Sequence, residues 1–151
     1  MIYIGSDHRG YNLKEYLKDY LSKARIPFKD VGNHKFDPED DYPDFAFEVA
    51  KAVARDLKHH TGVMICGSGL GMVVAANKVK GVRAGLATNE WLAKHGREND
   101  DLNIVSLAAD LTDFSMAEKI LKAWLNSKFI NEPKYQRRVK NIEEYEAKYF
   151  K

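Results

Sequence analysis

The sequence predicts an α/β fold in which a five-stranded parallel sheet is covered by helices on both faces. Short apolar runs alternate with amphipathic stretches along the chain, a pattern typical of consecutive βαβ units. The chain is 151 residues long, about the length of one domain. Because we find neither internal repeats nor low-complexity segments, we expect one domain over residues 1–151.

Five short apolar runs are the candidate strands. Each is too short for a helix, and an unbroken apolar run is typical of a parallel strand that is buried on both faces. In chain order the runs are 2–4, 28–31, 63–65, 83–86 and 104–105.

Amphipathic stretches between these runs predict the helices, because their apolar residues recur every three or four positions. The recurring sets are Leu13, Leu17, Tyr20, Leu21 and Ala24; Ala46, Val49, Ala50, Val53 and Leu57; and Ala117, Ile120, Leu121 and Trp124. The pairs Thr88-Asn89 and Thr112-Asp113 are candidate N-cap signals before two helices. The polar stretch from Gly32 to Pro43 contains two prolines and is expected to be irregular.

A last helix is expected over residues 135–149. Its apolar face is thin and consists of Val139, Ile142, Tyr145 or Glu146, and Tyr149. Two interpretations stay open: the helix reaches a partner subunit, or it lies on its own domain.

Composition excludes several classes of protein. The formal net charge is only +2, so no nucleic-acid partner is indicated outside the short basic stretch 134–140. No apolar run is long enough to span a bilayer, and residues 1–7 do not resemble a secretion signal. The single cysteine cannot form an internal disulfide, so we expect a cytoplasmic protein without a membrane partner.

The stretch Cys66–Gly71 follows a predicted strand and precedes a predicted helix. Three glycines in five residues allow a close backbone approach and direct several N–H groups at a ligand, which predicts a cradle for an anion. The spacing fits neither a Walker A loop nor a dinucleotide fingerprint. A tight turn without a ligand is the alternative.

Cys66, at the start of this stretch, suits general-base chemistry. A helix N-terminus stabilises a thiolate, although a lone cysteine is often only a small buried apolar residue. Aldose–ketose isomerisation needs a base that removes a carbon-bound proton, together with N–H donors for the enediolate oxygen. Ser68 would form a hydrogen bond to a sugar hydroxyl or relay the proton of that hydroxyl. Asp7 and His8 are candidates for the acid or base that opens a cyclic sugar.

A phosphate at the far end of the substrate would need cations. Arg9, Lys134, Arg137 and Arg138 are the candidates. The alternative for the last three is a solvated basic face of a helix.

Several stretches of the chain resemble the type B ribose-5-phosphate isomerases and the related galactose-6-phosphate isomerase subunits. The resemblance runs nearly from end to end and in order, and the Cys-Gly-Ser/Thr-Gly motif with a following Asn-Lys is specific. The matching stretches are 5–10, 41–43, 65–71, 75–78, 81–84, 103–105 and 135–139.

The resemblance implies a flavodoxin-like (Rossmann-like) three-layer sandwich, and a homodimer or tetramer whose sites are built from two subunits. It implies Cys66 as the enediolate base and Gly67–Gly71 as the anion hole, and it implies neither a metal nor an organic cofactor. It implies Asp7 and His8 as contacts of the sugar and its phosphate, and Lys134 and Arg138 as a phosphate clamp from the neighbouring subunit. Together with the candidates named above, the expected substrate-binding residues are Asp7, His8, Arg9, Tyr42, Gly67, Ser68, Gly69, Leu70, Gly71, Asn99, Asp100, Lys134, Arg137 and Arg138.

Three positions depart from the family pattern. Asn99 stands where the family has its ring-opening histidine, and Asp100 replaces an asparagine. Asp110, which is expected to repel phosphate, replaces a phosphate-binding arginine. His95, one helical turn before Asn99, is a substitute acid or base or else a surface histidine.

The function expected is the interconversion of ribose 5-phosphate and ribulose 5-phosphate. The alternatives are an isomerase for a hexose 6-phosphate or tetrose phosphate, and a non-catalytic module that binds a sugar phosphate. A flavin- or nucleotide-binding domain is a further alternative.

Overall fold

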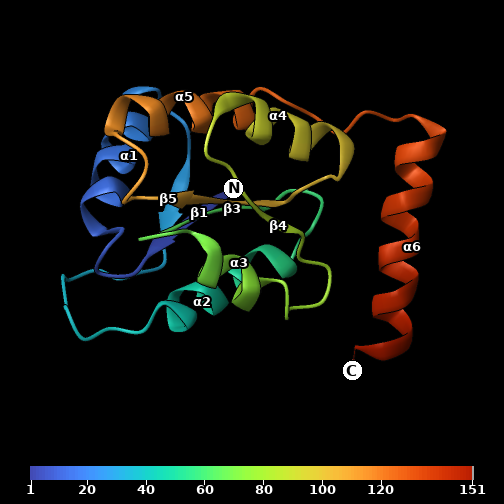
Figure 1. Ribbon diagram of the computed structural model, residues 1–151, viewed down its shortest axis with the longest axis horizontal. Helices are drawn as coiled ribbons and strands as arrows, with labels where there is room; N and C mark the ends of the chain where they lie inside the picture. The colour runs from blue at the N-terminus through green and yellow to red at the C-terminus, as the bar shows by residue number, and fades with distance from the viewer. Residues whose placement is uncertain (151) are drawn as a thin grey trace.

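The computed structural model, which describes residues 1–150, contains the parallel sheet and the two helical layers that the sequence predicts (Figure 1). The strands are β1 (Ile2–Ser6), β2 (Phe28–Asp30), β3 (Thr61–Cys66), β4 (Ala84–Leu86) and β5 (Ile104–Ala108). The helices are α1 (Tyr11–Lys23), α2 (Tyr42–Ala54), α3 (Leu70–Ala76), α4 (Glu90–Asn99), α5 (Phe114–Leu125) and α6 (Pro133–Tyr149). Within the described residues no helix has the length and apolar character needed to cross a membrane. That residues 1–151 form one domain stays a prediction.

The order of the strands in the sheet determines where a ligand crevice is expected. The strands lie in the order β2-β1-β3-β5-β4 and all pair in parallel. The chain leaves β1 toward one edge and then returns to β3 on the other side of β1, so the order reverses between these two strands. In open α/β sheets a ligand crevice forms at such a point, outside the carboxyl ends of the strands. Here those ends carry Ser6 and Cys66.

The side chains of β3 alternate between two buried clusters. Val63 and Ile65 contribute to the cluster that contains residues of α1 and α5, whereas Met64 and Cys66 contribute to the cluster that contains residues of α2 and α3. Figure 1 shows the corresponding layers, with α1, α4 and α5 on one face of the sheet and α2 and α3 on the other. The two-residue period of a strand therefore puts the Cys66 side chain on the face that α3 covers.

The predicted N-caps are confirmed, and two boundary predictions are wrong. The side chains of Asn89 and Asp113 accept hydrogen bonds from backbone N–H groups three residues later. Tyr42 belongs to α2 rather than to an irregular loop, because a proline is well tolerated in the first turn of a helix. Leu57 does not extend the apolar face of α2, which ends at Ala54.

Helix α6 stands beside the sheet, on the side away from the carboxyl ends of the strands (Figure 1). It touches its own chain through the buried residues Val139 and Glu146. The Glu146 carboxylate accepts a hydrogen bond of 3.0 Å from the backbone N–H of Gly81. Tyr145 and Ile142 stay exposed. Contact of α6 with a partner subunit stays a prediction.

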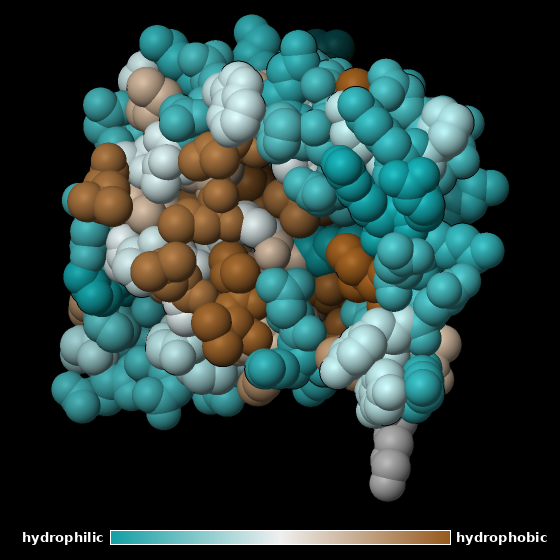
Figure 2. All heavy atoms as spheres, turned by 45° about the vertical axis from the view of Figure 1, so that its right-hand side comes forward, coloured by the Kyte–Doolittle hydropathy of each residue, from teal (hydrophilic) through white to brown (hydrophobic). Residues whose placement is uncertain are grey.

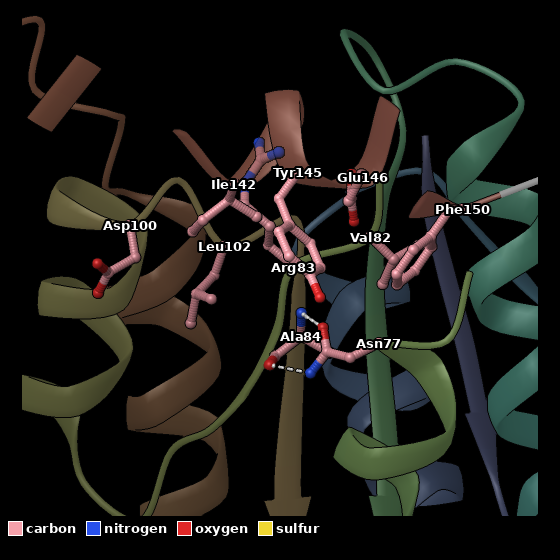
Figure 3. Close-up of a pocket in the computed structure, with 10 residues that line it drawn as sticks. All are labelled: Asn77, Val82, Arg83, Ala84, Asp100, Leu102, Ile142, Tyr145, Glu146 and Phe150. Atoms are coloured by element: carbon pink, nitrogen blue, oxygen red, sulfur yellow. Dashed lines mark hydrogen bonds between the residues drawn. The ribbon is translucent and has the colours of Figure 1, made fainter. Parts of the chain in front are cut away.

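A mainly apolar pocket of about 380 Å³ lies between α6 and the start of β4 (Figure 3). At its floor the Asn77 side chain forms hydrogen bonds to both backbone groups of Ala84, at 2.8 and 3.0 Å. The pocket is lined by Asn77, Val82, Arg83, Ala84, Asp100, Leu102, Ile142, Tyr145, Glu146 and Phe150. Besides the Glu146 contact, the Glu143 carboxylate of α6 lies 3.7 Å from the Arg83 guanidinium, so polar contacts at this pocket help to hold the helix.

Replacement of Glu146 by alanine is expected to destabilise the protein by about 1–3 kcal/mol, because it leaves the Gly81 N–H without its acceptor. Glu146→Gln, which keeps an acceptor oxygen, is expected to lower the stability by less. The free energy of unfolding in urea tests this, with Glu144→Ala on the exposed face of α6 as the matched control. Equal values for Glu146→Ala and Glu144→Ala would contradict the role assigned to this contact.

Candidate active site

The turn after β3 directs the thiol of Cys66 at the backbone that follows it. The N–H of Gly69 donates a hydrogen bond of 3.1 Å to the Cys66 sulfur, and this cysteine is only 4% exposed. Gly69 has a φ of +75°, and a Cβ at this position would lie 2.5 Å from the Leu86 side chain. Only glycine meets both the conformational and the steric demand, so this turn requires it.

Strand β5 holds the same turn from its other side. The hydroxyl of Ser106 donates to the Gly69 carbonyl at 2.8 Å. The N–H of Ala109 donates to the Cys66 carbonyl at 2.9 Å, and that of Asp110 donates to the Gly67 carbonyl at 3.0 Å. Three bonds from one neighbouring segment therefore fix the backbone around the thiol. At the start of α3 the N–H of Leu70 donates to the Ser68 hydroxyl, whereas those of Gly71 and Met72 have no intrahelical acceptor and are available to a ligand oxygen.

Asp7 lies at the end of the neighbouring strand β1. Its N–H donates to the carbonyl of Ile65 at 3.3 Å, which ties it to the end of β3. Its carboxylate is buried and accepts a hydrogen bond of 3.0 Å from the N–H of Gly10. Burial raises the pKa of Asp7 above its usual value, and the bond from Gly10 opposes this only in part. A carboxyl group in such a place holds its proton more readily than one in water.

His8 is held by a residue that sequence analysis did not single out. Its Nδ1 lies 2.7 Å from the Oδ1 of Asp40, and its backbone N–H donates to the same oxygen at 2.9 Å. The hydrogen bond from the His8 ring to the Asp40 carboxylate raises the pKa of His8. The other Asp40 oxygen accepts from the side chain of Asn33 at 2.7 Å. The imidazolium form of His8 is therefore favoured.

Asp7, His8 and Asp40 also form the one group within residues 1–150 whose geometry resembles a metal site. Their donor atoms all lie within 4.8 Å of one another. However, His8 and Asp40 face each other at hydrogen-bond distance, so a cation would first have to separate them. We therefore interpret the group as a hydrogen-bonded pair beside a buried acid.

Other predicted residues border the turn. The Arg9 guanidinium lies against Gly67, because a Cβ there would come within 2.3 Å of its Cζ, and it pairs with the Asp110 carboxylate. The Tyr42 ring lies against Gly71, where a Cβ would come within 2.6 Å of it. Ser68 is exposed, and its hydroxyl accepts from the N–H of Leu70 at 3.3 Å, while the Leu70 side chain itself points to solvent.

The remaining predicted residues lie at the opposite ends of the strands. Asn99 and Asp100 precede β5, whose first residue Ile104 pairs with Gly62, whereas Cys66 pairs with its last residue. Four residues of strand, about 13 Å, separate these two levels of the sheet. His95 lies between the two levels on α4, stacked on Trp91. An Asn99 side-chain nitrogen lies 3.4 Å from its ring.

The basic residues of α6 belong to this second group. The N–H of Ile130, just before α6, donates to the carbonyl of Glu98 at 2.9 Å, so α6 begins near the end of α4. Lys134, Arg137 and Arg138 lie exposed on its first turns. The structure thus brings Asp7, His8, Arg9, Tyr42 and Cys66–Gly71 together and leaves the second group far from them within one chain.

Sequence reasoning missed Ser106 and Asp40. Ser106 carried a signal, because it is a polar residue in the middle of an otherwise apolar strand. Asp40 carried no such signal, because it is one of several acidic residues in an irregular loop. Only the folded structure shows that it lies beside His8.

Asp40→Asn is expected to lower the pKa of His8, because it removes the carboxylate that stabilises the imidazolium. An NMR pH titration of the His8 ring measures this, with Glu39→Gln in the same loop as the control. Since the pKa of folded His8 is raised above the ordinary value of about 6.5, the pair stabilises the fold fully below that value. This stabilisation is lost as the pH rises through the pKa of folded His8. An unchanged titration in Asp40→Asn would contradict the assignment.

Known proteins match this chain over nearly its whole length. The sequence model of the family described as Ribose/Galactose Isomerase matches residues 2–142. A probable ribose-5-phosphate isomerase B of Mycoplasma genitalium is 39% identical, over 96% of this chain and 95% of the relative. A D-erythrulose-4-phosphate isomerase of Pectobacterium atrosepticum is 34% identical, over 85% and 84%.

Solved structures match the fold equally well. The crystal structure of ribose-5-phosphate isomerase B from Mycoplasma genitalium with bound ribulose 5-phosphate superimposes with a TM-score of 0.93 at 39% identity. It covers 97% of this chain and 95% of that one. The family match over most of the residues and the end-to-end likeness in fold lead to one conclusion. This chain belongs to the ribose/galactose isomerase family.

Proposed function

We propose that this protein is an aldose–ketose isomerase of sugar phosphates and that it interconverts ribose 5-phosphate and ribulose 5-phosphate. The observation that carries the proposal is the sulfur of Cys66, held 3.1 Å from a turn amide at the crevice between β1 and β3. Relatives of matching length that are named ribose-5-phosphate isomerase B support the substrate.

Cys66 acts as the base in this proposal. As the thiolate, it removes the proton from the carbon next to the carbonyl of the open-chain sugar and returns it to the former carbonyl carbon. Negative charge develops on the neighbouring oxygen in between, and the N–H groups of Gly67–Gly71 stabilise it. Because the proton and the electron pair move within one substrate, the reaction needs neither an oxidant nor a reductant. During the reaction a proton also passes from the hydroxyl of the sugar to the former carbonyl oxygen. The Ser68 hydroxyl forms hydrogen bonds to these two oxygens.

Ring opening of a cyclic substrate needs a second acid or base. Asp7 is the candidate within the same cluster, because its buried carboxyl has a raised pKa. His95 is the candidate from the second group, since Asn99 cannot transfer a proton near neutral pH. His8 stays paired with Asp40 and contacts the substrate as a cation.

We propose further that a second copy of this chain completes each site. The second group of predicted residues lies about 13 Å or more from Cys66 along the sheet, too far for one substrate to contact both. Exposed apolar residues such as Leu70 and Val74 of α3 remain without a cover, and Figure 2 shows apolar side chains gathered beside α6. Such a surface is typical of a protein interface. In this homodimer Asn99, Asp100, Lys134, Arg137 and Arg138 serve the partner's Cys66 cluster.

A tetrose phosphate is the second candidate substrate. A four-carbon aldose phosphate cannot close a stable ring through its phosphorylated end, so it needs no ring-opening histidine. Asn99 at that position favours this candidate, as does the similarity to an erythrulose phosphate isomerase. The buried, unbridged Cys66 suits a reducing compartment, and we propose the cytoplasm.

Cys66→Ala is expected to abolish isomerisation while the protein stays folded, because the small residue fits the same buried place. Ketose formation from four-, five- and six-carbon aldose phosphates measures the activity, and thermal unfolding checks the fold. Ser127→Ala, far from the turn, is the control. Turnover within about threefold of the unmodified protein would remove Cys66 from the mechanism; tight binding without turnover in the unmodified protein would indicate a binding module.

Mixing two inactive variants tests the shared site. In a heterodimer of Cys66→Ala and Arg138→Ala chains, one site carries both changes and the other carries neither. Random reassembly is therefore expected to restore about a quarter of the unmodified activity. Rapid mixing without subunit exchange is the control. No recovery after demonstrated exchange would place both residues in the same chain's site and contradict the proposal.

A further inference from the structure

One ion pair crosses the mouth of the Cys66 cluster. The guanidinium of Arg9 pairs with the carboxylate of Asp110, and the two side chains are 54% and 42% exposed. Arg9 follows β1 and Asp110 follows β5, while the turn between them follows β3. The pair therefore joins the loops on both sides of the catalytic turn.

Both partners are anchored to that turn. The N–H of Asp110 donates to the Gly67 carbonyl at 3.0 Å, so its backbone is fixed there. Gly10, next to Arg9, approaches the Ile65 carbonyl so closely that a Cβ would lie 2.4 Å from it. The Arg9 guanidinium itself lies against Gly67. As a result, the cation sits over the backbone that would receive a ligand oxygen.

The bond between the two side chains is replaceable. An exposed ion pair contributes only about 0–1 kcal/mol, because water solvates both groups well. A phosphate group offers more negative charge and several acceptor oxygens to the planar donor fork of arginine. In the resting protein, however, the Asp110 carboxylate occupies Arg9 and so competes with an approaching anion for it.

We propose that Asp110 determines the affinity of this site for anionic substrates by competing with their phosphate for Arg9. The inference deepens the proposed function and rests on it for the identity of the substrate. Removal of the carboxylate frees Arg9, and substrate binding exchanges one acidic partner for another. Asp110 is therefore a specificity-determining residue, and its effect must depend on Arg9.

Inorganic phosphate provides a test that does not require activity. We expect Asp110→Asn to bind phosphate about fivefold more tightly than the unmodified protein, because phosphate then no longer has to displace an exposed ion pair. In an Arg9→Ala background the same change is expected to give no gain. Calorimetric titration at constant ionic strength measures the four dissociation constants. Asp19→Asn, which breaks the exposed Lys23–Asp19 pair on α1, is the control and is expected to change nothing.

Three results would overturn the inference. They are weaker or equal phosphate binding by Asp110→Asn, a gain that persists without Arg9, and an equal gain in Asp19→Asn. A gain without Arg9 would mean simple charge repulsion rather than competition. Asp110→Ser, measured alongside, and unfolding midpoints of all variants separate these results from a folding defect.

Kinetics distinguish the inference from the proposed function. With ribose 5-phosphate we expect Asp110→Asn to lower KM by the same factor and to change kcat less than twofold. If phosphate binding behaves as expected but no sugar phosphate is isomerised, the proposed function fails and the competition stands. If isomerisation occurs but KM rises in Asp110→Asn, the competition fails and the proposed function stands.

Discussion

The proposed chemistry depends on the hydrogen bond between the Gly69 N–H and the sulfur of Cys66. It exists because Gly69 adopts a left-handed conformation that leaves no room for a side chain. Strand β5 then fixes the turn through Ser106. A sulfur and a row of backbone donors are thereby held side by side before any substrate arrives. Preorganised donors of this kind need no rearrangement when charge develops, which is why they are effective in catalysis.

The topology of the sheet decides what can join this turn. Because the strand order reverses between β1 and β3, the buried carboxyl of Asp7 comes to lie beside the same crevice as Cys66. The same topology carries α4 back to the amino ends of the strands, so Asn99 and the basic start of α6 lie at the other end of the sheet. The two groups of predicted site residues thus lie toward opposite ends of the sheet, and in the proposed homodimer a symmetric pair of chains brings them together.

The layers of the fold and the glycine turn after β3 could be predicted from the sequence, for physical reasons. Apolar runs such as 63–65 predict buried strands, and the glycine spacing after Cys66 predicts a turn whose backbone can approach a ligand. The His8–Asp40 contact could not be predicted, because it joins a strand end to an irregular loop across 32 positions of sequence. Asp110 was expected only to repel phosphate, and its pairing with Arg9 required the folded chain. Tyr42 was placed in a loop because proline signals a break, although Pro43 here lies in the first turn of a helix. The place of α6 against a partner subunit stays a prediction, since a thin apolar face fits either surface.

A crystal structure of this protein with ribulose 5-phosphate bound would show directly whether Cys66 is the base. We expect the Cys66 sulfur within about 3.5 Å of the carbon that exchanges its proton, with the carbonyl oxygen of the sugar against the N–H groups of the glycine turn. A sugar phosphate bound elsewhere, with the sulfur directed into the hydrocarbon core between α2 and α3, would contradict it.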